Sequence, residues 1–136
     1  MKKLILLTAL LFIGMVSMAQ NYLGKSLNEV KSILDSKSIA YEEYVNSGGK
    51  YSVKYIIESE ERIYVFNYAD KCDLYVINFT SSDMVYNYAK LFTKQGYILQ
   101  NTNEENVMWV FKKGNLSAGC IYNEDEYLYS IVVRNK

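Results

Sequence analysis

The chain has 136 residues, of which 50% are hydrophobic, 22% charged and 15% aromatic, and it contains two cysteines, no histidine and no proline. This composition is typical of a single globular domain and excludes collagen-like, disulfide-dense and disordered chains. The lack of histidine excludes mechanisms that need an imidazole, such as Ser-His-Asp hydrolysis and His-ligated zinc or haem. Basic and acidic residues number 15 each, and because no basic run stands out we expect no nucleic-acid partner.

Residues 1–19 are typical of a secretory signal peptide. Lys2 and Lys3 give a positive start, residues 4–16 are almost entirely apolar, and Ser17-Met18-Ala19 supplies small residues for cleavage. The apolar segment is shorter than the about 20 residues of a membrane span, which favours cleavage over the alternative of an uncleaved anchor.

Residues 20–136 are therefore expected to form a single domain that is periplasmic or secreted, with no integral membrane span after signal cleavage. Export places the protein in an oxidising compartment, where Cys72 and Cys120 could pair. The alternative, which we favour because their predicted positions do not obviously meet, is that each cysteine is a small buried hydrophobic residue or a lone thiol.

Helix signals occur in two segments. Residues 25–37 have Ser26 as a capping residue, Glu29 three positions later as in a capping box, and apolar residues at helical spacing. Residues 83–95 show a second apolar stripe, and Gly96 is well placed to end that helix.

Between and after the helices the hydrophobic period changes to two, and β-branched and aromatic residues dominate. The pattern predicts eight strands, joined by turn-forming segments, near residues 39–45, 51–57, 62–68, 73–79, 97–101, 107–111, 116–122 and 127–133. The order is one helix and four strands, twice, and weak matches between the halves favour possible repeats over 24–80 and 81–136.

Hairpin pairing sorts the strand residues onto two faces. One face is rich in aromatic residues, including Tyr51, Tyr64, Tyr68 and Tyr75, and should lie under the helices. Tyr22, Tyr41, Tyr44, Tyr86 and Tyr127 are harder to place and are expected to be surface residues. The predicted fold is α+β: a duplicated α-β-β-β-β unit with two helices packed on one face of an antiparallel sheet of about eight strands.

Two short helices can cover only one face of such a sheet, which leaves the other face open. This open face is too apolar for a purely solvated surface, and exposed apolar patches of this size usually mark contacts. The alternative is that valine and isoleucine occur there because they favour the strand backbone. The candidate partner-binding residues are the aliphatic Ile63, Val65, Leu74, Val76, Ile121, Leu128 and Val132, with Lys54, Lys112 and Arg134 as a polar rim.

No catalytic, cofactor-binding or metal-binding residues are predicted. The acidic turns at 58–61, 70–73 and 123–126 lack the alternating ligand spacing of a known calcium loop and are expected to be solvated. Gly48-Gly49-Lys50 is a hairpin turn rather than a phosphate loop, and Cys72 has no histidine or CxxC partner.

The segment Gly24-Lys25-Ser26-Leu27-Asn28-Glu29-Val30 resembles the Gly-x-Ser/Thr-x-x-Glu-Val segment of small exported domains similar to the β-lactamase inhibitor protein and the SmpA/OmlA outer-membrane lipoproteins. The resemblance implies helices on an antiparallel sheet. In the inhibitor the unit is duplicated and the sheet presents a concave protein-binding surface. The second half of this chain lacks the Gly-x-Ser segment, each half has one predicted helix where the inhibitor has two, and there is no lipobox, so the resemblance assigns no binding residues.

These observations favour an exported, non-enzymatic domain that binds a protein through the open face of its sheet. The protein partner is unidentified, and self-association through the same face is a competing interpretation. The alternative function is a periplasmic small-ligand or lipid carrier with a pocket between the helices and the sheet.

Overall fold

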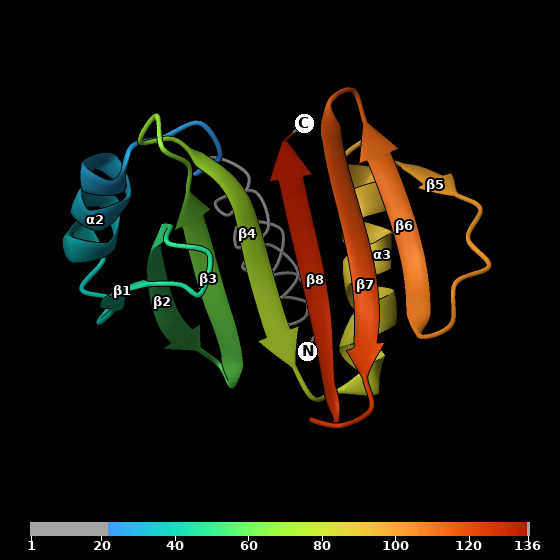
Figure 1. Cartoon of the computed structure of the whole chain (residues 1–136). Coiled ribbons are helices and arrows are strands. Elements are labelled where there is room, and N and C mark those ends of the chain that lie inside the picture. Colours follow the sequence, from blue (N-terminus) through green and yellow to red (C-terminus); the bar gives the residue numbers. More distant parts are fainter. Residues whose placement is uncertain (1–21, 136) are drawn as a thin grey trace, which may run out of the picture.

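The computed structural model describes residues 22–135, so the expected signal peptide at 1–19 lies outside the described residues. The chain forms an α+β fold, in which two helices accompany one antiparallel sheet (Figure 1). The helices are α2 (Leu27–Ser36) and α3 (Ser82–Lys94). The strands are β1 (Glu42–Val45), β2 (Tyr51–Ile57), β3 (Glu60–Phe66), β4 (Cys72–Phe79), β5 (Ile98–Gln100), β6 (Val107–Lys113), β7 (Leu116–Asn123) and β8 (Leu128–Asn135).

The eight strands form one sheet in the order β1-β2-β3-β4-β8-β7-β6-β5. Each half of the chain contributes four consecutive strands, and the halves meet where β4 pairs with β8, with Val76 opposite Val132. The long strands therefore lie at the centre, while the short strands β1 and β5 form the two edges.

The capping signals of the sequence are confirmed. The Ser26 side chain accepts a hydrogen bond from the Glu29 amide, and the Glu29 carboxylate accepts one from the Ser26 amide, which completes the capping box of α2. Asp70 also accepts a hydrogen bond from the Leu27 amide and so ties the start of α2 to the β3–β4 turn. After α3, Gly96 has a φ of 89°, a conformation that glycine adopts without strain.

The β2–β3 turn is shorter than expected. Ile57 pairs directly with Glu60, so only Glu58 and Ser59 form the turn, and both have positive φ values as a type I′ turn requires. Strand β3 therefore begins at Glu60 rather than at residue 62 and ends at Phe66. As a result Tyr68, which the sequence placed on a strand beneath the helices, lies beyond the strand and is 84% exposed.

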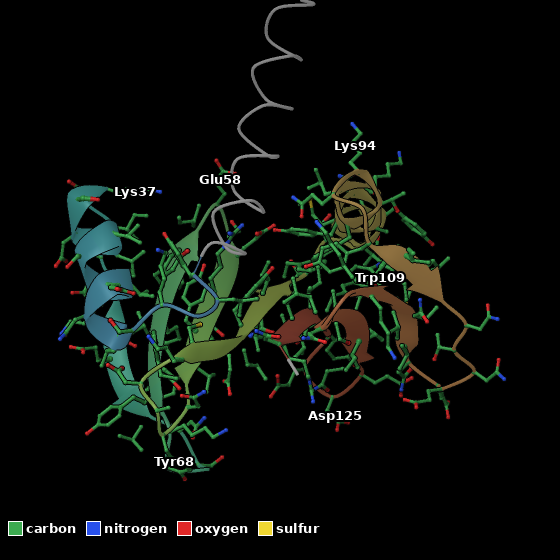
Figure 2. All side chains as sticks on the ribbon, turned by 90° about the horizontal axis from the view of Figure 1, so that it is seen from above. Lys37, Glu58, Tyr68, Lys94, Trp109 and Asp125 are labelled. Carbon is green, nitrogen blue, oxygen red and sulfur yellow. The ribbon has the colours of Figure 1, made fainter. Side chains whose placement is uncertain are left out.

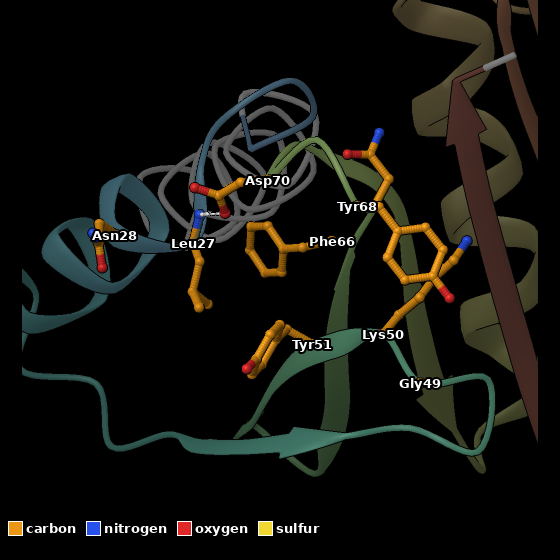
Figure 3. Close-up of a pocket in the computed structure, with 9 residues that line it drawn as sticks. Leu27, Asn28, Gly49, Lys50, Tyr51, Phe66, Tyr68 and Asp70 are labelled. Atoms are coloured by element: carbon orange, nitrogen blue, oxygen red, sulfur yellow. Dashed lines mark hydrogen bonds between the residues drawn. The ribbon is translucent and has the colours of Figure 1, made fainter.

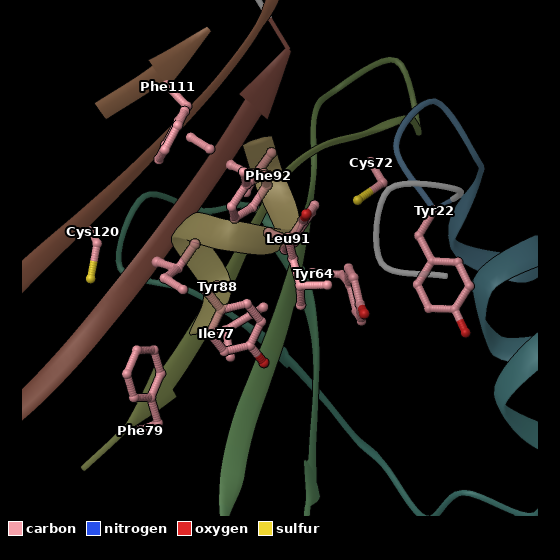
Figure 4. Packing of buried hydrophobic residues seen from close by; sticks show 14 of the residues in the cluster. Tyr22, Tyr64, Cys72, Ile77, Phe79, Tyr88, Leu91, Phe92, Phe111 and Cys120 are labelled. Carbon is pink, nitrogen blue, oxygen red and sulfur yellow. The ribbon is translucent and has the colours of Figure 1, made fainter. Parts of the chain in front are cut away.

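Both helices pack on the aromatic face of the sheet, as expected. Figure 2 shows α2 and α3 over opposite halves of that face, and Figure 4 shows part of the resulting core. Besides Tyr68, two further placements of tyrosine were wrong: Tyr22 is buried and packs edge-on against Tyr64, whereas Tyr51 is mostly exposed. Tyr51 is at the start of β2 and lines a groove with Leu27 of α2.

Candidate functional site

The strand register places all ten sequence-predicted binding residues on the face opposite the helices. Ile63 pairs with Val76, which pairs with Val132, and this central row of aliphatic side chains runs across β3, β4 and β8. Val65 and Leu74 form the next row, which continues to Arg134. Lys54 pairs with Ile63 at one end of the central row, and Lys112 reaches Arg134 through Ser117.

We call the seven aliphatic side chains the open-face patch: Ile63, Val65, Leu74, Val76, Ile121, Leu128 and Val132. None of them is buried; six are partly exposed, and Ile121 is 43% exposed. Ile121 and Leu128 lie on β7 and β8, toward the β7–β8 turn. The part of the chain that the structure describes places no helix over this patch.

Polar groups lie on both sides of the five central residues Ile63, Val65, Leu74, Val76 and Val132 along the strands, while Ile121 pairs with Ser130 in one of the polar rows and Leu128 lies beyond that row. On one side, Asn78 donates a hydrogen bond to Glu61 and accepts one from Ser130, so three neighbouring strands are linked by a polar row. On the other side lie Arg134 and Lys112, both exposed. This arrangement of an apolar centre and a polar rim is the usual anatomy of a protein-binding surface.

Two further features of this face were not foreseen in the sequence. Gly119 stands between Val132 and Val110 in the central row, so this position of the row carries no side chain. Ser52, which shares this face by register, is buried rather than open. At the same edge, the Lys54 ammonium forms an ion pair with Glu42 and lies over the Tyr44 ring.

A groove of about 490 Å³ lies at the end of the sheet beside the start of α2 (Figure 3). Tyr51, Phe66 and Tyr68 supply its aromatic walls, and Lys50 lies beside Tyr68. Two of its polar side chains already have hydrogen-bond partners within the fold. Asp70 accepts a hydrogen bond from the Leu27 amide, and Asn67 accepts hydrogen bonds from amides of its own turn. The groove was not predictable from the sequence pattern, because it depends on the position of Tyr68 beyond the end of β3.

A buried charged cluster lies beneath α3. Glu60 and Arg62 are 7% and 3% exposed, and one Arg62 nitrogen lies 3.2 Å from a Glu60 carboxylate oxygen. The Tyr88 hydroxyl of α3 donates to the same oxygen at 2.5 Å. The expectation that the acidic segment 58–61 is a solvated turn is therefore wrong for Glu60, because the two-residue turn brings this carboxylate into the strand and under the helix.

Tyrosines surround this cluster. The Tyr55 and Tyr64 hydroxyls share a hydrogen bond at 2.9 Å, and burial raises the pKa of both phenols. Burial likewise raises the pKa of Tyr88 and Tyr75. These hydroxyls therefore stay protonated at neutral pH. Those of Tyr55, Tyr64 and Tyr88 are hydrogen-bonded inside the core, whereas the buried Tyr75 hydroxyl has no hydrogen-bond partner among the described residues.

The two cysteines are free and buried, which agrees with the favoured prediction. Cys72 is on β4 and Cys120 on β7, with β8 between these strands (Figure 4). Burial raises the pKa of each thiol to about 12, so neither is a ready nucleophile. Within residues 22–135, no group of three metal-ligating side chains comes together.

Because the pKa values of both thiols are raised in the folded protein, the free energy of unfolding should decrease at alkaline pH. Because the unfolded thiols release their protons near the ordinary pKa of 9.0 and the folded ones only near 12, unfolding is increasingly favoured as the pH rises between these values. Buried tyrosines such as Tyr22, whose pKa burial raises to about 12, act in the same direction. We expect urea unfolding to give a lower free energy at about pH 10.5 than at about pH 8. Equal values would contradict the burial of these groups.

Comparisons with protein-family models, with characterised proteins and with solved structures find no match to this chain. Neither α2 nor α3, the helices of the described segment 22–135, is long and apolar enough to span a membrane.

Proposed function

We propose that this chain is an exported, non-enzymatic binding domain that contacts a protein partner through the open-face patch. The observation that carries the proposal is the continuous set of partly exposed aliphatic side chains across β3, β4 and β8, opposite the face that α2 and α3 cover. Burial of this patch supplies the binding energy, and Lys54, Lys112 and Arg134 set the orientation of the partner.

The size of the face suits a protein better than a small molecule. The six long strands lie side by side in the order β2, β3, β4, β8, β7 and β6. At about 4.8 Å between strands and about 23 Å of strand length, they present about 650 Å², near the about 800 Å² that each partner contributes to a standard interface.

Strand propensity alone does not account for the patch. Valine and isoleucine favour extended backbone wherever they occur, but leucine has no comparable preference. Leu74 and Leu128 nevertheless share this face, and Leu74 lies directly opposite Val65. An exposed leucine between aliphatic neighbours is better explained by a contact that buries it.

Export and the resemblance to exported domains with a protein-binding sheet are consistent with this function. The segment 1–19 supplies the export signal, and the capping segment 24–30 carries the resemblance. The partner is then another protein of the periplasm or of the extracellular space.

Site-specific photo-crosslinking in cells of the source organism tests the proposal. A photoreactive residue at Val76 or Val132 should yield the same protein adduct, because both positions lie within the patch. The control position is Tyr86, which is exposed on α3 and lies on the helix-covered side of the sheet. An adduct that forms equally from Tyr86, or no adduct from either patch position, would contradict the proposal.

The alternative function, a carrier of small ligands or lipids, has support from a different part of the structure. A second groove, between α3 and the β5–β6 edge, is lined mainly by apolar side chains.

A further inference from the structure

The edge of the sheet beside α3 carries an apolar groove of about 590 Å³. Strand β5 is three residues long and leaves the outer flank of α3 uncovered. Leu99 and Met108, on the sheet side of the groove, are 62% and 42% exposed. Ala89, Trp109 and Phe111 complete the apolar surface of the groove.

Apart from the Lys90 and Lys94 ammonium groups and the Tyr86 hydroxyl, the polar side-chain groups that line the groove are already hydrogen-bonded. The Trp109 indole N–H donates to the Val85 carbonyl oxygen at 3.0 Å, and the Thr93 hydroxyl donates to the Ala89 carbonyl oxygen at 2.9 Å. An extended peptide would bring backbone N–H and C=O groups that need partners. An alkyl chain needs none, so the surface suits an alkyl chain better than a peptide.

Two lysines give the groove its charge. Lys90 and Lys94 stand four residues apart on α3, and therefore on the same face of the helix, and both line the groove (Figure 2 labels Lys94 and Trp109). Lys113 is also near this edge, but its ammonium group donates to the Gln95 carbonyl oxygen at 2.7 Å. The acidic side chains of this edge, Glu104 and Glu105, follow β5 on the loop to β6 and do not line the groove.

The geometry points to a binding site for a free single-chain amphiphile with an anionic head group. The head lies between Lys90 and Lys94, and the alkyl chain follows α3 toward Tyr86 and Met108. From the midpoint between Lys90 and Lys94 to Tyr86 the helix rises about 9 Å, the length of about seven carbons of an extended chain. Charge complementarity favours an anionic head over a neutral or cationic one.

Trp109, the only tryptophan of the chain, lines the groove and serves as the reporter. Laurate, titrated below its micelle concentration, should change the Trp109 fluorescence in a saturable way. Dodecyltrimethylammonium has the same chain length with a cationic head and should bind at least about tenfold more weakly.

Two variants test the two parts of the groove. K90E/K94E reverses the charge of two exposed side chains, and Leu99→Glu places a charge on the apolar wall. Each should weaken laurate binding by about tenfold or more. Lys71→Glu, on the exposed β3–β4 turn, is the matched control and should bind laurate as the unaltered chain does. Circular dichroism checks folding, and K90E/K94E keeps the test valid if Leu99→Glu fails to fold.

Three results would overturn the inference: no saturable response to laurate, equal binding by K90E/K94E and the control, or binding only to anionic phospholipid vesicles. The groove lies on the helix-covered side of the sheet, so the inference is independent of the open-face patch. A V65K/V76K variant should still bind laurate, and the two proposals can therefore fail separately.

Discussion

Replacing Arg62 by methionine should lower the free energy of unfolding by about 3–5 kcal/mol. The substitution keeps much of the side-chain volume but removes the guanidinium that lies against the buried Glu60 carboxylate. The carboxylate then keeps the hydrogen bond that the Tyr88 hydroxyl of α3 donates, but it has lost its ion-pair partner. Since domains of this size are stable by only about 5–15 kcal/mol, this single change should bring the protein close to unfolding at room temperature.

A double variant separates the pair from its surroundings. Replacing Glu60 by leucine together with Arg62 by methionine removes both charges, and apolar replacement of a buried pair is often neutral or stabilising. The double variant should therefore lose less stability than Arg62→Met alone, as measured by urea unfolding at neutral pH. A loss below about 1 kcal/mol in the single variant would show that the pair is not buried as described.

The second large effect concerns binding. Changing Val65 and Val76 together to lysine should weaken partner binding by about a hundredfold or more, because central apolar residues dominate interface energies. The two residues lie in neighbouring rows of β3 and β4, so both charges would face the centre of the interface. Binding is measured with the partner identified by crosslinking, and circular dichroism confirms the fold.

Two control variants on α3 strengthen this experiment: Asp83→Lys raises the net charge by two, as V65K/V76K does, and Tyr86→Lys raises it by one. Tyr86→Lys and Asp83→Lys place lysine on the exposed side of α3, where no contact with the partner is proposed. Both should bind the partner normally. Equal loss of binding in these variants would show that added positive charge, rather than the open-face patch, controls the interaction.

The sequence predicted the parts of the fold that depend on local chemistry and on period. The capping box of Ser26 and Glu29, the stop at Gly96 and the alternation of the strands each follow from interactions within a few residues. Because alternation survives small errors in turn length, the ten candidate residues could be assigned to one face even though β3 begins two residues earlier than expected.

Features that depend on non-local packing were missed. The turn at Glu58 and Ser59 lacks the Asn-Gly pattern that signals a two-residue hairpin, so the position of Glu60 could not be foreseen. The burial of Arg62 did have a signal: it shares the period of Tyr64 and Phe66, which places it on the covered face. The groove beside α3 exists because β5 has only three residues. The sequence predicted a longer strand at 97–101, and so gave no sign of the groove.

The most direct test of the central claim compares lysine at two neighbouring positions of β8. Val133 is fully buried beneath the helices, whereas its neighbour Val132 lies on the open face. Urea unfolding should show that Val132→Lys changes the free energy of unfolding by less than about 1 kcal/mol, while Val133→Lys costs several kcal/mol or prevents folding. Equal, severe destabilisation by both substitutions would show that the face opposite the helices is covered, and would contradict a binding surface there.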